Sequence, residues 1–123
     1  MSSDGFDFEG LVRAGYPLQQ FQSGERIFVS GDEGNAMYAV RTGSVAIMSA
    51  GEVLETVRPG ETFGELTLID GSPRGATAIA REPTEVAVID ERAFHFLVER
   101  NPSFALDLLR RLSRRLRAMN ENR

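Results

Sequence analysis

Glycine-containing turns divide residues 18–90 into short apolar runs, and this spacing limits the fold more than any other feature. The runs are LQQFQ, RIFVS, AMYAVRTGSVAIM, EVLETV, ATAIA and EVAVID. The segments between them include QSGE, SGDEGN, SAGE and RPGE, each with a glycine that can adopt a positive φ in a turn. Val86 and Val88 show the alternation typical of half-buried strands. Short strands at regular spacing predict a β-sandwich or a β-barrel.

Helical patterns lie on both sides of this strand-rich segment. The stretch FDFEGLVRAG predicts a short N-terminal helix that ends at Gly15. After the last strand, ERAFHFLVER has helical spacing, and the Asn101–Pro102 step then interrupts it. A second helix follows, with its proline near the first turn, where proline is favourable. We therefore expect a single domain over residues 1–123, with a β region at 18–90 and two C-terminal helices at 91–120.

The last predicted helix has an apolar face and a basic face. Its apolar positions form one stripe, which consists of Ala105, Leu108, Leu109, Leu112, Leu116 and Met119. Arginines occupy most of the other positions. Two interpretations of these arginines stay open. They form a solvated face of a helix that packs on the β region, or some of them belong to a site.

Composition excludes several functional classes. The net charge of −4 argues against a nucleic-acid-binding domain, although all 14 basic residues are arginine. The chain has no cysteine and a single histidine, His95, which we expect at the edge of the core. A typical zinc site or a cysteine–histidine dyad therefore cannot be assembled. No run approaches the ~18 apolar residues of a membrane helix, and MSSDGFDFEG lacks the order of a signal peptide. These features predict a cytoplasmic protein.

The stretch FGELTLIDGSPRGATA has the features of an anion-binding site. Gly64 allows close approach to the backbone just before ELTLID, which can form one helical turn with free N–H groups at its start. Arg74 can bind two phosphate oxygens, and Gly75 and Ala76 leave their N–H groups accessible. Glu65 would repel a phosphate unless it accepts hydrogen bonds from a sugar. A ligand with both a phosphate and a sugar fits this pattern. The alternative is a plain surface ion pair between Glu65 and Arg74, which would contribute only ~0–1 kcal/mol to stability.

Two motifs in this order resemble the cyclic nucleotide-binding domain family, to which the effector domain of the catabolite activator protein belongs. FGELTLIDGSPRGATA resembles the phosphate-binding cassette of the family, and RIFVSGDEGNAMYAVRTGSV resembles its other signature. The asparagine–proline step lies where the family has a hinge, and the resemblance covers about residues 11–117. It implies a mainly β fold, an eight-stranded antiparallel β-roll of jelly-roll type. An N-terminal helix, a short cassette helix and two C-terminal helices would flank this roll.

The resemblance also implies a role for each matching residue. Those expected to bind the cyclic phosphate are Arg74, Gly75, Ala76 and Thr67. Those expected at the ribose are Gly64, Glu65 and Leu66. The C-terminal helix would close over the base as a lid, with candidate residues Arg115, Leu112 and Leu116. Relatives that favour cGMP use a hydroxyl directly after the arginine. Gly75 has none, so cAMP is the expected ligand and cGMP the weaker one.

The sequence thus predicts a sensor module that binds a cyclic nucleotide and signals to a protein effector by moving its C-terminal helix. We expect neither an enzyme nor a protein that binds nucleic acid, a membrane, a metal or a cofactor. Two alternatives stay open: a nucleotide-free interaction domain of the same fold, or the effector domain of a larger regulator or channel. A small barrel enzyme of cupin type is disfavoured, because the histidine ligands that it needs are missing.

Overall fold

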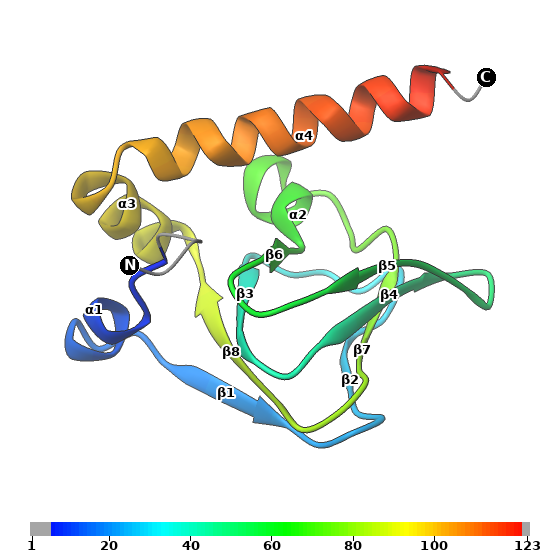
Figure 1. Ribbon diagram of the computed structural model, residues 1–123, viewed down its shortest axis with the longest axis horizontal. Helices are drawn as coiled ribbons and strands as arrows, with labels where there is room; N and C mark the ends of the chain where they lie inside the picture. The colour runs from blue at the N-terminus through cyan, green and yellow to red at the C-terminus, as the bar shows by residue number, and fades with distance from the viewer. Residues whose placement is uncertain (1–5, 122–123) are drawn as a thin grey trace.

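The computed structural model describes the backbone of residues 6–121 and the side chains up to residue 117. Two sheets form a roll, and helices lie along one side of it (Figure 1). The helices are α1 (Phe8–Arg13), α2 (Glu65–Asp70), α3 (Glu91–Arg100) and α4 (Ser103–Glu121). The strands are β1 (Leu18–Phe21), β2 (Arg26–Phe28), β3 (Met37–Thr42), β4 (Val45–Ser49), β5 (Glu52–Val57), β6 (Thr62–Phe63), β7 (Thr77–Ala80) and β8 (Thr84–Ile89).

All strand pairs in the two sheets are antiparallel. One sheet has the order β1-β8-β3-β6 and the other has the order β2-β7-β4-β5. This arrangement confirms the predicted eight-stranded roll with its flanking helices. Strand β6 was not among the predicted runs, because it has only two residues, Thr62 and Phe63, which pair with Ala39 and Tyr38 of β3. A strand of two residues has no periodicity to detect.

The core consists of two clusters, and the central strands β3 and β8 contribute to both. Met37 and Ile89 face the helices, where they pack with Leu97 of α3 and Leu108 of α4. Val86 faces the interior of the roll, as do Val40, Val45 and Phe63. Successive side chains of a strand point to opposite faces. Strands covered by helices on one face and by the other sheet on the opposite face are therefore apolar on both.

Caps define the helix boundaries that the sequence predicted. The Asp7 carboxylate accepts a hydrogen bond of 2.9 Å from the Gly10 N–H at the start of α1. Asp90 does the same for the Ala93 N–H of α3, also at 2.9 Å. After α1, Gly15 adopts a φ of 91°, a conformation that favours glycine. The chain thus enters and leaves the roll at fixed points.

Two expectations about the outer helices are wrong. The His95 side chain is 68% exposed and lies 3.6 Å from Glu91 one turn earlier, rather than at the edge of the core. The apolar stripe of α4 is covered only in part among the described side chains, since Leu108 is buried whereas Leu109 and Leu116 are exposed; the side chain of Met119 lies outside the described residues. The roll covers a narrower sector of α4 than the sector over which its leucines are spread. Helical periodicity gives the angular position of a side chain but not the width of the surface that covers it.

Candidate functional site

Helix α2 begins and ends at glycines with a left-handed backbone. Gly64 has a φ of 79° and Gly71 has a φ of 74°. A Cβ built on Gly64 would lie 2.9 Å from Nη1 of Arg74, whereas a Cβ on Gly71 would meet nothing within 4 Å. Gly64 is therefore required both for its backbone conformation and for the close approach of an arginine.

Arg74 is held in place by the main chain and by aromatic rings. It is only 5% exposed. Nη1 donates a hydrogen bond of 3.1 Å to the Gly64 carbonyl, and Nη2 donates one of 2.8 Å to the Ala36 carbonyl. The guanidinium carbon lies 4.2 Å from the centroid of the Phe28 ring, a cation–π distance. Its Nε is buried and has no hydrogen-bond partner among the described residues, so this donor remains for an anion.

The loop before β3 positions the same arginine from the other side. The Arg74 N–H donates to the Asp32 carbonyl at 2.8 Å, and the Gly31 N–H donates to the Arg74 carbonyl at 2.7 Å. A Cβ on Gly34 would lie 2.8 Å from Nη2 of Arg74. The segment SGDEGN, which is part of the second sequence signature, thus has a clear structural role. It fixes the backbone of Arg74 and leaves room for its side chain.

Burial lowers the pKa of Arg74 but leaves its side chain charged. Removal from water is the main cause that lowers the pKa of Arg74, and the neighbouring Tyr38 and Asp32 oppose this shift. An arginine guanidinium remains protonated in proteins even so. A buried, permanently charged group with a donor still available is well suited to bind a phosphate.

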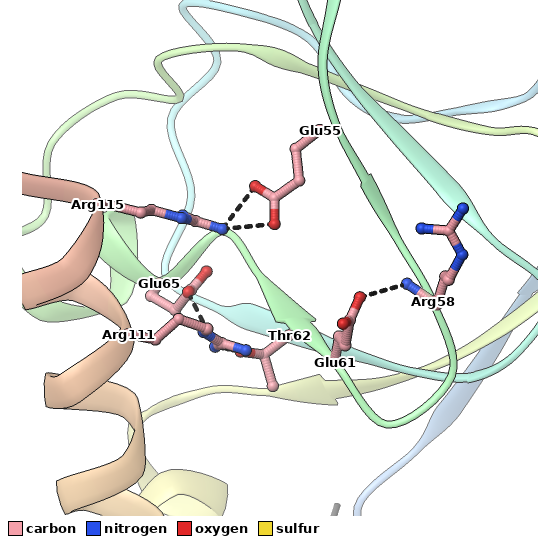
Figure 2. A network of polar contacts seen from close by, with 7 residues as sticks. All are labelled: Glu55, Arg58, Glu61, Thr62, Glu65, Arg111 and Arg115. Carbon is pink, nitrogen blue, oxygen red and sulfur yellow. Dashed lines mark hydrogen bonds and ion pairs between the residues drawn. The ribbon is translucent and has the colours of Figure 1, made fainter. Parts of the chain in front are cut away.

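Glu65 pairs with an arginine that the sequence did not single out. Its side chain is 2% exposed, and Oε2 accepts a hydrogen bond of 3.2 Å from Nη2 of Arg111 on α4. The same Nη2 donates to the hydroxyl of Thr62 (Figure 2). Glu65 and Arg74 are both buried, so they do not form the surface ion pair considered above. Glu65 instead joins the cassette to the C-terminal helix, which passes over α2 (Figure 1).

Arg115, one turn after Arg111, also points toward the roll. Its Nη2 lies 2.5 Å from Oε1 and 2.7 Å from Oε2 of Glu55 on β5 (Figure 2). Both side chains remain partly exposed, at 41% for Arg115 and 38% for Glu55. Of the other two lid candidates, Leu112 packs against the helix-side core, whereas Leu116 is 60% exposed. The structure therefore brings Arg115 to the site side of α4 and turns Leu116 away from the core.

The remaining cassette residues differ in their exposure. Thr67 is buried and Leu66 is exposed on α2. Gly75 lies in open space, where an added Cβ would meet nothing within 4 Å, and Ala76 is half-buried. The predicted contacts of these residues with a ligand use mainly backbone N–H groups, which side-chain exposure does not test. Their roles therefore stay predictions.

Sequence reasoning missed Arg111, Glu55 and Gly34 as residues of this site. A signal for Arg111 was present, because residues three and four apart share a helix face. Arg111 and Arg115 follow the buried Leu108 at spacings of three and seven and therefore point toward the roll. Glu55 and Gly34 lack such a signal, because their partners are distant in the sequence.

No helix within residues 6–121 is long and apolar enough to cross a membrane.

Comparisons with known proteins agree with this geometry. The family model described as "Cyclic nucleotide-binding domain" matches residues 18–101. The cyclic AMP receptor protein of Thermus thermophilus is 36% identical over 112 residues, which are 87% of this chain and 52% of the receptor. The crystal structure of the Thermus thermophilus catabolite activator protein has a TM-score of 0.79 at 33% identity, with 96% of this chain and 59% of that chain covered.

A third comparison concerns a protein of similar size. A structure from work on a cyclic-GMP-dependent signalling pathway that regulates bacterial phytopathogenesis has a TM-score of 0.74 at 27% identity. The match covers 94% of each chain. The matched region is a ligand-binding domain and not a catalytic one, as predicted. Because the family model matches more than half of the chain, and a receptor with 36% identity matches most of it, this chain belongs to the cyclic nucleotide-binding domain family.

Proposed function

We propose that this chain binds 3′,5′-cAMP and acts as a regulatory sensor that signals through α4. One observation carries the proposal. The guanidinium of Arg74 is buried and held by two main-chain carbonyls and the Phe28 ring, while its Nε has no partner among the described residues. Burial of a charge is costly unless that charge is compensated. A cyclic phosphate that contacts Nε would compensate it.

The rest of the ligand follows from the position of the phosphate. With the phosphate on Arg74 and the backbone of Thr67, Gly75 and Ala76, the ribose would lie beside Gly64, Glu65 and Leu66. Glu65 can accept a hydrogen bond from the 2′-hydroxyl without releasing Arg111, because a carboxylate accepts several hydrogen bonds. Binding of the sugar and closure of α4 over the site therefore support each other.

Movement of α4 provides the signal in this proposal. The helix is joined to the site by Arg111 and Arg115, and it begins directly after Asn101 and Pro102. The Asn101 backbone is extended, with a φ of −146°, so helix continuity is already broken there. Rotation about this hinge would move α4 without a change in the roll. The effector that reads the movement is a protein, and we place the sensor in the cytoplasm.

The base preference rests on Gly75. A hydroxyl at this position would accept a hydrogen bond from the 2-amino group of guanine, and Gly75 has none. One unmade hydrogen bond is worth ~1–2 kcal/mol. We therefore propose that cAMP binds about tenfold more tightly than cGMP, since ~1.4 kcal/mol corresponds to a factor of ten.

Calorimetric titration with cAMP tests the assignment of the phosphate site. Replacement of Arg74 by alanine should weaken binding by roughly 2–5 kcal/mol, the cost of truncating one partner of a hydrogen-bonded charge pair. Arg81→Ala is the matched control, since it removes an exposed arginine just beyond the other end of β7 and should leave affinity unchanged. Unchanged cAMP affinity in Arg74→Ala, with the variant still folded, would refute the site.

One observation favours the alternative of a nucleotide-free interaction domain. Arg111 already neutralises Glu65, so the carboxylate does not need a ribose hydroxyl. In that case α4 would stay closed and neither cAMP nor cGMP would bind. The same titration distinguishes the two functions, because a wild-type chain that binds neither nucleotide at millimolar concentration supports the alternative.

A further inference from the structure

The ion pair between Glu55 and Arg115 is a further polar link between α4 and the roll. Both carboxylate oxygens of Glu55 lie within 2.7 Å of the same nitrogen of Arg115. The pair joins the middle of β5 to a helix that is already anchored by Leu108 in the core and by the Arg111–Glu65 contact. Yet both side chains are more than one third exposed, so an incoming ligand can reach their polar atoms.

The pair lies at one end of a row of groups. Arg74 contacts Gly64, next to it comes Glu65, and Glu65 contacts Arg111. Arg115 follows one helical turn later, and a turn advances about 5.4 Å along the axis. In a cyclic nucleotide the ribose lies between the phosphate and the base. If the phosphate binds Arg74 and the sugar binds Glu65, the next position in the row, beside Glu55 and Arg115, receives the base.

The chemistry of the pair is specific for one purine. A carboxylate only accepts hydrogen bonds, and a guanidinium only donates them. Adenine presents the 6-amino donor beside the N7 acceptor, whereas guanine presents two acceptors, O6 and N7, at the same edge. Glu55 can accept from the 6-amino group while Arg115 donates to the neighbouring ring nitrogen. Against guanine, Glu55 would face O6, and two acceptors would oppose each other.

We infer that Glu55, held by Arg115, is a specificity-determining residue that selects a 6-amino purine over a 6-oxo purine. The inference rests on the proposed function. It adds a second source of selectivity, distinct from Gly75, whose missing hydroxyl concerns the 2-amino group. The competing interpretation is a plain strap between β5 and α4. A strap would affect every ligand equally, so the ratio of affinities distinguishes the two.

The experiment titrates three ligands against three proteins. The ligands are cAMP, cGMP and inosine 3′,5′-cyclic monophosphate (cIMP), which has the 6-oxo group without the 2-amino group. The proteins are the wild type, Glu55→Gln and the control Glu52→Gln, an exposed glutamate on the same strand. We expect wild type to bind cAMP at least tenfold more tightly than cIMP. Glu55→Gln should reduce this ratio at least fivefold, because the glutamine amide can donate to O6, and Glu52→Gln should leave it unchanged.

Three outcomes would overturn the inference. Equal weakening of all three ligands in Glu55→Gln would show a strap and no selection. Wild-type binding of cIMP as tight as that of cAMP would show that position 6 is not read. A preference for cGMP over cIMP that Glu55→Gln abolishes would show that the carboxylate reads the N1 and N2 donors of guanine. In all three cases nucleotide binding itself persists, and the proposed function stands; binding of none of the ligands would instead refute both.

Discussion

The two sides of the site are built from different kinds of contact. On the cassette side, the Arg74 side chain donates hydrogen bonds to the main-chain carbonyls of Gly64 and Ala36, and the Arg74 backbone N–H donates to the carbonyl of Asp32. On the α4 side, Arg111 and Arg115 bond to side chains. Glu65, the partner of Arg111, is buried, whereas the Arg115–Glu55 pair is partly exposed. The first set exists whenever the roll is folded. The second set exists only while α4 lies against the roll.

In the proposed function, this difference separates recognition from signalling. Main-chain contacts cannot rearrange without disturbing β3 and β7, so the proposed phosphate subsite is preorganised and would cost little to order when a ligand binds. The partly exposed Arg115–Glu55 pair contributes little, and salt screens it. It can break and re-form with a small change in free energy, whereas loss of Arg111 from the buried Glu65 costs more. A sensor needs both properties, a rigid place for the ligand and an element whose equilibrium the ligand can shift.

A substitution on the cassette side, where Arg74 bonds to the main chain, should have the largest effect on cAMP affinity. Gly64→Ala places a Cβ about 2.9 Å from Nη1 of Arg74 and also strains a backbone with a φ of 79°. The strain should lower the free energy of unfolding by about 1–2 kcal/mol. Displacement of the guanidinium should in addition weaken cAMP binding tenfold or more. Chemical denaturation and calorimetry measure the two effects separately.

Gly71→Ala provides the matched control for this prediction. Gly71 has a similar φ of 74° at the other end of α2, but an added Cβ there meets nothing within 4 Å. Its stability loss should not exceed that of Gly64→Ala, because only the backbone is strained, while its cAMP affinity should remain that of the wild type. If the two variants bind cAMP equally well, the close approach of Arg74 to Gly64 does not matter for binding.

Disturbing the switchable side should have a smaller effect on affinity. Arg111→Gln leaves the buried Glu65 without its charged partner and should lower the free energy of unfolding by about 1–3 kcal/mol. Binding of cAMP should weaken only several-fold, since Arg74 is untouched. Arg110→Gln is the control, because its contact of 3.4 Å with Asp107 is exposed and worth ~0–1 kcal/mol.

A second substitution sharpens the same prediction. In Arg111→Gln combined with Glu65→Gln, no buried carboxylate is left unpaired, so part of the lost stability should return. A coupling energy near zero in this double-mutant cycle would show that the two side chains do not interact in solution. It would also remove the proposed link between the ribose subsite and α4.

The roll and the cassette were predictable because their signals are local. Turn glycines such as Gly43 and Gly60 adopt positive φ, and ELTLID forms α2 from Glu65 to Asp70 as expected. These features depend on a few neighbouring residues. The resemblance to the family then indicated how the strands pair, which no local pattern contains.

The α4 side was harder to predict because its contacts join distant parts of the chain. Glu55 and Arg115 are 60 residues apart, and Glu65 and Arg111 are 46 apart. Five arginines lie between residues 110 and 117, and composition does not say which of them face the roll. The burial of Leu108, with Phe104 and Leu112 packed against the same core, gives the phase of the helix, and this burial is known only from the structure. Arg111 was therefore missed although Arg115 was predicted.

Hydrogen exchange tests the central claim most directly, because it reports on both sides of the site in one experiment. With saturating cAMP, amide exchange should slow across residues 104–119 of α4, and it should change little in β3 and β8, which are already protected in the core. The same comparison in Arg74→Ala should show no slowing. Identical exchange in α4 with and without bound cAMP would contradict the account, since the ligand would then bind without shifting the helix that is proposed to carry its signal.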